Sequence, residues 1–311
     1  MASHSRATVA STLDTALRGR VRARKNWQMA LARFRRNGLA MFGLVLALFS
    51  IVVALIAPAI APYNPADTDF ANINAWPSAQ HLFGTDASGA DIFSITITAL
   101  RTSYTVAFIA QGMTLFAGML VGMVAGYFRG WVDAVLSRLI DVLFSFPNII
   151  VAILIAGTFG VPMYQRFGPA GRLYLTVGAL SLFNWVGLAR VIRGEVLRLR
   201  EQDYVEASIV AGGRGSWIIV HHMLPNLLGL AAVLTSLGVG FALVLEATLS
   251  YLGLGVTAPT PSLGRLIQAG QVYIDPLWYQ FLFPAVVLAL LVLAYAFIGD
   301  GLRDALDPRQ R

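Results

Sequence analysis

The chain has 311 residues, of which 57% are hydrophobic and only 13% are charged, against about 25% charged in ordinary soluble domains. A soluble core cannot bury that much apolar surface, so the composition excludes a soluble domain and favours a membrane protein. The absence of cysteine excludes disulfide frameworks and cysteine-ligated metals, and the net charge of +7 indicates a partner that is either nucleic acid or a membrane surface.

The chain begins with a basic segment, 1–38, and residues 1–25 are expected to be disordered or to lie on lipid headgroups. The first uncharged window follows and contains "LAMFGLVLALFSIVVALIAP", which is long enough to cross a bilayer, since about 20 residues suffice. This apolar run is longer than the core of a secretory signal peptide, and no clean small-residue cleavage site follows it. The sequence therefore predicts a retained first span over 39–61.

Further uncharged windows predict five more spans. Segments embedded in lipid must satisfy their backbone hydrogen bonds internally, so each span is expected to be a helix. The predicted fold is an all-α membrane protein with six transmembrane helices, in which a loop over 62–100 separates the first span from the rest. The other five helices are expected near 103–126, 141–160, 173–190, 224–250 and 281–300.

The distribution of Lys and Arg predicts the orientation. If the N-terminus lies inside the cell, the inner segments hold 19 of the 23 basic residues, as the positive-inside rule requires. Both termini are then cytoplasmic and the loop 62–100 is extracytoplasmic. This also explains the basic charge without nucleic acid, for which the sequence has no motif. The inner segments are 1–38, 127–140, 190–223 and 301–311.

A polar stretch between the fourth and fifth predicted spans, "YVEASIVAGGRGSWIIVHHMLPN", breaks the apolar pattern. Four of its small or aromatic residues recur at helical spacing and share one face, which permits close approach by another protein. Gly212 can end this helix, and Pro225 suits the start of the next span. The sequence leaves two interpretations open, a helix resting on headgroups or a docking element for a cytoplasmic partner. The shared face consists of Tyr204, Ala207, Ser208 and Ala211.

This stretch resembles the EAA motif of ABC importer permeases, which reads E-A-A-x3-G-x9-I-x-L-P. The chain departs from it at two positions, where Ser208 replaces Ala and His222 replaces Ile. The resemblance implies that 203–217 is a coupling helix that docks into a groove of an ATPase. The residues that the resemblance implies for this coupling site are Tyr204, Glu206, Ala207, Ser208, Gly212, Leu224 and Pro225.

Other stretches resemble the C-type subunit of the dipeptide, oligopeptide and nickel permease family, and the resemblance covers about residues 30–309. It implies the type I ABC importer permease fold, with a core over 101–302 and a cytoplasmic tail over 303–311. Ala90 and Ile95 stand where the family usually has arginine. The stretches are "HLFGTDASGADIFS" (81–94), "GYFRGWVDAVLSRLIDVLFSFP" (126–147), "LSYLGLGVTAPTPSLG" (249–264) and "GDGLRDALDPR" (299–309).

The resemblance also implies partners and a location. They are a second homologous permease, two cytoplasmic ATPases that carry ATP and Mg, and an extracytoplasmic substrate-binding protein, in the cytoplasmic membrane of a bacterium or archaeon. The chain itself has no G-x4-G-K-[ST] loop, so no ATP, catalytic residue or cofactor is expected on it. Di- or oligopeptides are the leading substrate, and nickel chelates or other small solutes are the alternative.

Three groups of single residues allow competing interpretations. Glu246, near the outer end of the fifth span, either lines a pathway or gate or bonds to neighbouring Ser and Thr groups. Asp141 is expected to pair with Arg138 or another inner arginine. His81, His221 and His222 are not expected to bind metal, because adjacent histidines on a helix point to different faces.

The aromatic stretch "DPLWYQFLFP" (275–284) is typical of a membrane interface, and it can also form a receptor for the binding protein together with the loop 62–100. Other classes of protein remain open at this point. A secondary transporter needs inverted repeats, which the sequence does not display, and a channel needs a polar pore ring. An integral enzyme would have Glu246 as its sole intramembrane candidate.

Overall fold

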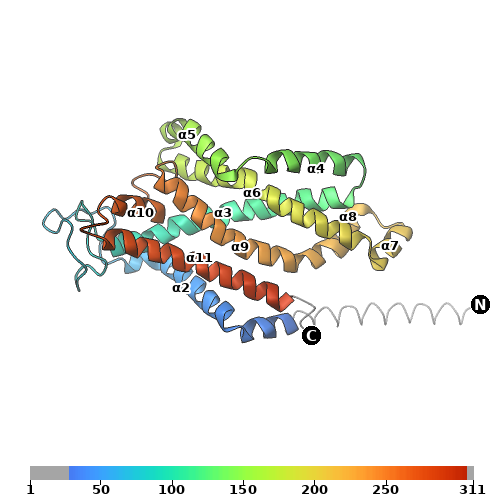
Figure 1. Cartoon of the computed structure of the whole chain (residues 1–311), viewed down its shortest axis with the longest axis horizontal. Coiled ribbons are helices and arrows are strands. Elements are labelled where there is room, and N and C mark those ends of the chain that lie inside the picture. The colour runs from blue at the N-terminus through green and yellow to red at the C-terminus, as the bar shows by residue number, and fades with distance from the viewer. Residues whose placement is uncertain (1–27, 307–311) are drawn as a thin grey trace, which may run out of the picture.

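A computed structural model describes residues 28–306 of the chain, and Figure 1 shows an elongated bundle of helices. Within this range the backbone is helical apart from turns, loops and an isolated bridge between Thr85 and Asp91. Residues 28–36 form a helix before the first long one. The elements that follow are α2 (Gly38–Ile60), α3 (Ile92–Tyr127), α4 (Trp131–Phe144), α5 (Asn148–Phe167), α6 (Pro169–Arg200), α7 (Asp203–Val210), α8 (Gly215–Ile218), η1 (Ile219–Met223), α9 (Leu224–Tyr251), α10 (Leu263–Gln271) and α11 (Tyr279–Leu306).

Six helical stretches of the described chain are long and apolar enough to cross a membrane, which confirms the predicted all-α fold with six spans. They are α2, α3, α5, α6, α11 and the continuous stretch from α8 through α9. Residues 1–27 and 307–311 are outside the described range. The expectation that residues 1–25 are disordered or lie on headgroups therefore concerns residues outside this range, as does part of the predicted tail over 303–311.

Glycines on α3 bring it close to α6. Gly118, Gly122 and Gly126 recur every four residues on one face of α3. A Cβ at Gly122 would lie 2.7 Å from the carbonyl oxygen of Ala189, and one at Gly126 would lie 2.7 Å from Cβ of Val196. Small residues at this spacing let two membrane helices pack backbone against backbone. The α3–α6 pair therefore forms the tight centre of the bundle.

The third predicted span differs from the structure. A single helix was expected near 141–160, but the chain forms α4, then a break at residues 145–147, then α5. Pro147 explains the break, because it has no backbone N–H and disfavours the helical conformation of Phe146. The helices α4 and α5 then run in succession along α6, as contacts of Asp141 with Arg190 and of Asn148 with Asn184 show.

The fourth span is also longer than predicted. It was expected over 173–190 and to be the shortest, whereas α6 extends from Pro169 to Arg200. The predicted helix stopped at Arg190 because the uncharged window stops there. The observed helix continues through its arginines, because acidic residues of α4 pair with them. Arg193 binds both carboxylate oxygens of Asp133, at 2.6 and 2.8 Å, and Arg190 binds Asp141 at 2.7 Å. The expected pairing of Asp141 with an arginine is thus confirmed, and the partner is Arg190.

The second span begins before its expected start at 103, and the loop expected over 62–100 ends at Ile92. Asp91 caps this helix, since its carboxylate accepts a hydrogen bond from the backbone N–H of Ser94 at 2.8 Å. Asp91 also binds Nδ1 of the buried His81 at 3.0 Å. The end of the loop is therefore fixed on α3 by buried polar contacts.

Candidate functional site

The stretch that resembles the EAA motif forms the short helix α7 at one end of the bundle (Figure 1). Its C-terminus has the hydrogen bonds of a Schellman motif, in which the N–H of Gly213 donates to Ser208 and that of Gly212 donates to Ile209, both at 3.0 Å. Gly212 has a φ of +80°, a conformation that glycine adopts without strain. Gly212 therefore ends α7, as its sequence position predicts.

One apolar side chain anchors α7 to the bundle. Val205 is fully buried in a cluster with Leu199, Ile218, Met223 and Leu227, which come from α6, α8, η1 and α9. The sequence pattern does not distinguish Val205 from Ile209 and Val210, which are apolar residues of the same helix but exposed. Because Val205 packs against both flanking helices, α7 is held on the bundle rather than only on lipid.

The rest of α7 is open to solvent. Tyr204, Glu206, Ala207 and Ala211 are exposed, and Ser208 is half-buried. Ser208 and Ala211 also line a hollow of about 380 Å³, together with Gly213, Arg214 and Trp217. Glu206 makes no ion pair or side-chain hydrogen bond within residues 28–306. The small face predicted from helical spacing is thus exposed and adjoins a hollow, with an unpaired carboxylate beside it.

The two positions at which the chain departs from the motif contact each other. The Oγ atom of Ser208 lies 3.5 Å from Nε2 of His222, within hydrogen-bond distance. Trp217 and Tyr204 pack on the His222 ring, with centroid distances of 5.1 and 5.9 Å. This small cluster links α7 to the turn that leads into α9.

Leu224 and Pro225 begin α9, but the helical stretch that is long enough to cross a membrane begins earlier than the predicted 224, at Gly215. The preceding turn η1 is π-helical, and the N–H of Leu224 donates to the carbonyl of Ile219. Pro225 has no N–H to offer the carbonyl of His221, which favours a widened turn at this point. The widened turn places His221 and His222 toward different partners, and no cluster of three or more potential metal ligands occurs within the described residues.

Glu246 lies far from α7 and is completely buried. Its carboxylate accepts hydrogen bonds from the hydroxyls of Ser103 and Ser250, both at 2.8 Å. Ser103 belongs to α3, so this contact ties α3 to α9 inside the bundle. These contacts fit the interpretation in which Glu246 bonds to neighbouring Ser and Thr groups.

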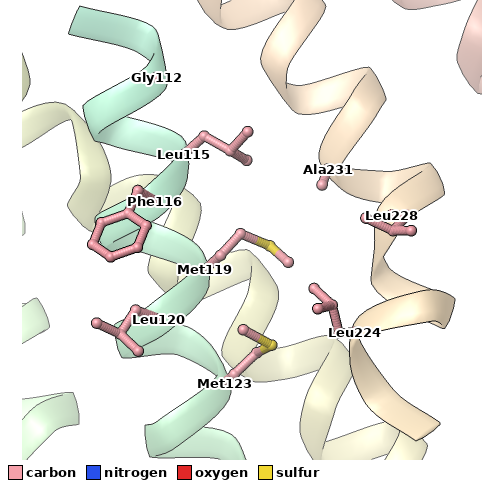
Figure 2. Close-up of a pocket in the computed structure, with 9 residues that line it drawn as sticks. All are labelled: Gly112, Leu115, Phe116, Met119, Leu120, Met123, Leu224, Leu228 and Ala231. Carbon is pink, nitrogen blue, oxygen red and sulfur yellow. The ribbon is translucent and has the colours of Figure 1, made fainter. Parts of the chain in front are cut away.

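An apolar hollow of about 370 Å³, which no sequence pattern predicts, lies between α3 and α9. Figure 2 shows Met119 and Leu224 directed into the gap between the two helices. Its lining has no polar or charged side chain, and Glu246 is not part of it. The lining residues are Gly112, Leu115, Phe116, Met119, Leu120, Met123, Leu224, Leu228 and Ala231.

At the opposite end of the bundle from α7, the loop before α3 packs on the aromatic stretch 275–284. Trp76 lies 5.2 Å from Tyr279, and Phe83 stacks on Phe283 with ring centroids 4.3 Å apart. The structure therefore joins the two segments that the sequence suggested as one receptor surface. Ala90 and Ile95, which stand in place of arginines, are both buried, and their uncharged side chains form no ion pair at these positions.

Comparison with known proteins places these features in a family. Residues 118–311 match the family model described as "Binding-protein-dependent transport system inner membrane component". Residues 25–77 match the "N-terminal TM domain of oligopeptide transport permease C".

Individual relatives agree with the family models. The chain is 37% identical to the oligopeptide transport system permease protein OppC of Haemophilus influenzae, over 93% of this chain and 90% of the relative. It is 36% identical to the dipeptide transport system permease protein DppC of Alkalihalophilus pseudofirmus, over 92% of this chain and 90% of the relative. It is also 35% identical to OppC of Bacillus subtilis, over 92% and 90% of the two chains. The chain therefore belongs to the permease subunits of binding-protein-dependent ABC importers, in the group that contains the C-type dipeptide and oligopeptide permeases.

Proposed function

We propose that this permease imports di- or oligopeptides and that α7 couples it to a separate ATPase. The coupling proposal rests on one observation: α7 is anchored to the bundle while its face of small residues is exposed. Val205 fixes α7 on the bundle, while Tyr204, Ala207 and Ala211 remain exposed. Movement of a docked partner can then be transmitted to α6 and α9 through the cluster around Val205.

The proposed complex contains this chain, a second homologous permease, two cytoplasmic ATPases that bind ATP and Mg, and an extracytoplasmic substrate-binding protein. The exposed Glu206 is available to meet a basic group on the ATPase. The loop after α2, packed on the start of α11, is the surface proposed to receive the binding protein. The distribution of Lys and Arg supports a cytoplasmic position for α7 and both termini, in the inner membrane of a bacterium or archaeon.

The names of the relatives support peptides as the substrate class. Nickel chelates or another small solute are the alternative within the same architecture. In such importers the delivered substrate is selected largely by the binding protein, which is a separate chain.

Reconstitution in liposomes tests this proposal. The chain alone should hydrolyse no ATP, and the complete complex should hydrolyse ATP faster when its binding protein carries a peptide. Uptake of labelled peptide should require ATP inside the compartment that faces α7. ATP hydrolysis by the isolated chain, or peptide uptake without the ATPases, would overturn the proposal.

A further inference from the structure

The helix α4 has two different faces. One face packs on α6, where Asp133 binds Arg193 and Asp141 binds Arg190, and Ile140 beside them is buried. The other face points away from the bundle and is apolar. Trp131 is 77% exposed there, and Val135, Leu139 and Val142 are also exposed.

One cation lies in the middle of the outward face of α4. Arg138 follows Val135 by three residues and precedes Val142 by four, so the three side chains share one stripe. Arg138 is exposed. Within residues 28–306 it has no ion pair, hydrogen bond or aromatic partner, since Asp141 is occupied by Arg190. An unpaired arginine on an apolar, lipid-facing surface is costly unless it reaches the headgroup region or an anion there.

The direction of α4 indicates where that anion lies. The helix begins at the end of the bundle that carries α7 and runs toward the middle (Figure 1). Arg138 is about 10 Å along the axis from Trp131, given 1.5 Å per residue. Helical side chains lean toward the N-terminus of their helix, so the guanidinium of Arg138 reaches back toward the level of Trp131. Tryptophan favours the headgroup region, and arginine extends to the same depth from an apolar position.

We propose that Trp131 and Arg138 form a binding site for an anionic phospholipid in the leaflet on the α7 side. The guanidinium holds the phosphate, for which its paired donors are suited. An acyl chain lies along Val135, Leu139 and Val142. The pairing of a cation with an apolar stripe fits a phospholipid, which offers a phosphate and a hydrocarbon chain together. Only the identification of this leaflet as the cytoplasmic one rests on the orientation proposed above.

Native mass spectrometry of the purified full chain tests this site. Phosphatidylglycerol is titrated into the detergent-solubilised protein, and retained lipid is counted for the wild type and for Arg138→Gln. The variant should hold the tightest phosphatidylglycerol about fivefold more weakly, which is the effect of one basic residue at an anionic surface. Arg138→Lys should recover part of the loss, because it restores the charge without the paired donors.

Arg198→Gln is the matched control, because Arg198 is an exposed arginine at the same end that already pairs with Glu195. It should leave phosphatidylglycerol retention unchanged, and inorganic phosphate should not displace the lipid. Equal retention by the wild type and Arg138→Gln, or an equal loss in Arg198→Gln, would overturn the proposal. Co-purification of the companion permease is a second readout, and its loss from Arg138→Gln together with unchanged lipid retention would also overturn the proposal and assign the face to a protein. Lipid counts do not depend on orientation, so an inverted topology would leave this result intact.

Discussion

Ser208 and His222 show how two departures from a motif can compensate each other. Both replace apolar residues of the EAA pattern, and their side chains meet at 3.5 Å. Each polar group thus has a partner in a half-buried setting. Neither residue alone would have predicted the contact, because it depends on how α7 folds back on the turn before α9.

A double-mutant cycle tests this pair. Ser208→Ala and His222→Ile each leave one polar group without its partner, at a cost of about 1 kcal/mol. The double variant restores two apolar side chains, so its loss of thermal stability should be smaller than the sum of the single losses. Thermal unfolding of the purified chain measures all three. Strictly additive losses would show that the two side chains do not interact.

The buried carboxylate of Glu246 allows a second test. It is completely buried and bonded to Ser103 and Ser250. Glu246→Ala should cost about 2 kcal/mol of stability, because it leaves a cavity and two hydroxyls without their acceptor. Glu201→Gln, at an exposed ion pair with Arg129, is the control and should cost less than about 1 kcal/mol. If Glu246→Ala unfolds at the wild-type temperature but abolishes uptake, a pathway role is favoured instead.

The helices α3 and α6 pack closely at the glycines of α3. A Cβ at Gly122 would approach the carbonyl oxygen of Ala189 and the side chain of Ile192 within 2.9 Å, whereas Gly112 on the same helix has open space around it. Gly122→Ala should therefore lower the stability of the folded chain by about 1–3 kcal/mol. Gly112→Ala should have no such effect, since alanine favours a helix over glycine. Equal unfolding temperatures for the two variants would contradict close packing at Gly122.

Sequence patterns predicted some elements well and others poorly, for physical reasons. The helix α2 is uncharged, so the uncharged window predicted its bounds closely. The helix α11 continues past its predicted end at 300 to Leu306, through Asp300, Arg303 and Asp304, because charged residues at the end of a span do not stop a helix. The helix α6 extends past its window because Asp133 and Asp141 neutralise its arginines, and such pairing across helices is invisible in one sequence. The break before α5 had a local signal in Pro147 that the uncharged window concealed.

The candidate site was predicted in part. Helical spacing predicted the face of small residues on α7, and Gly212 predicted where this helix ends. The anchor Val205 and the contact between Ser208 and His222 depend on tertiary packing against α8, η1 and α9. The apolar hollow between α3 and α9 could not be predicted either, because its walls come from residues more than a hundred positions apart.

In the six-span topology, the loop after α2 and the helix α7 lie on opposite sides of the membrane. The chain has no cysteine, so a single introduced one reports its own position. Asn72 and Val210 are exposed, and cysteines placed there should react with a membrane-impermeant thiol reagent from opposite sides. Labelling of both from the same side would contradict the six-span topology.

The docking of α7 on an ATPase can be measured by a pull-down of the ATPase from detergent extracts. Ala207→Trp fills the exposed small face, and overpacking a close contact costs about 1–3 kcal/mol. Glu206→Lys opposes the proposed basic partner. Ala32→Trp, at an exposed alanine near the same end of the bundle, controls for added bulk. We expect Ala207→Trp and Glu206→Lys to reach the membrane at wild-type levels but to lose the ATPase, while Ala32→Trp retains it. Retention of the ATPase and of full transport by both α7 variants would contradict the account.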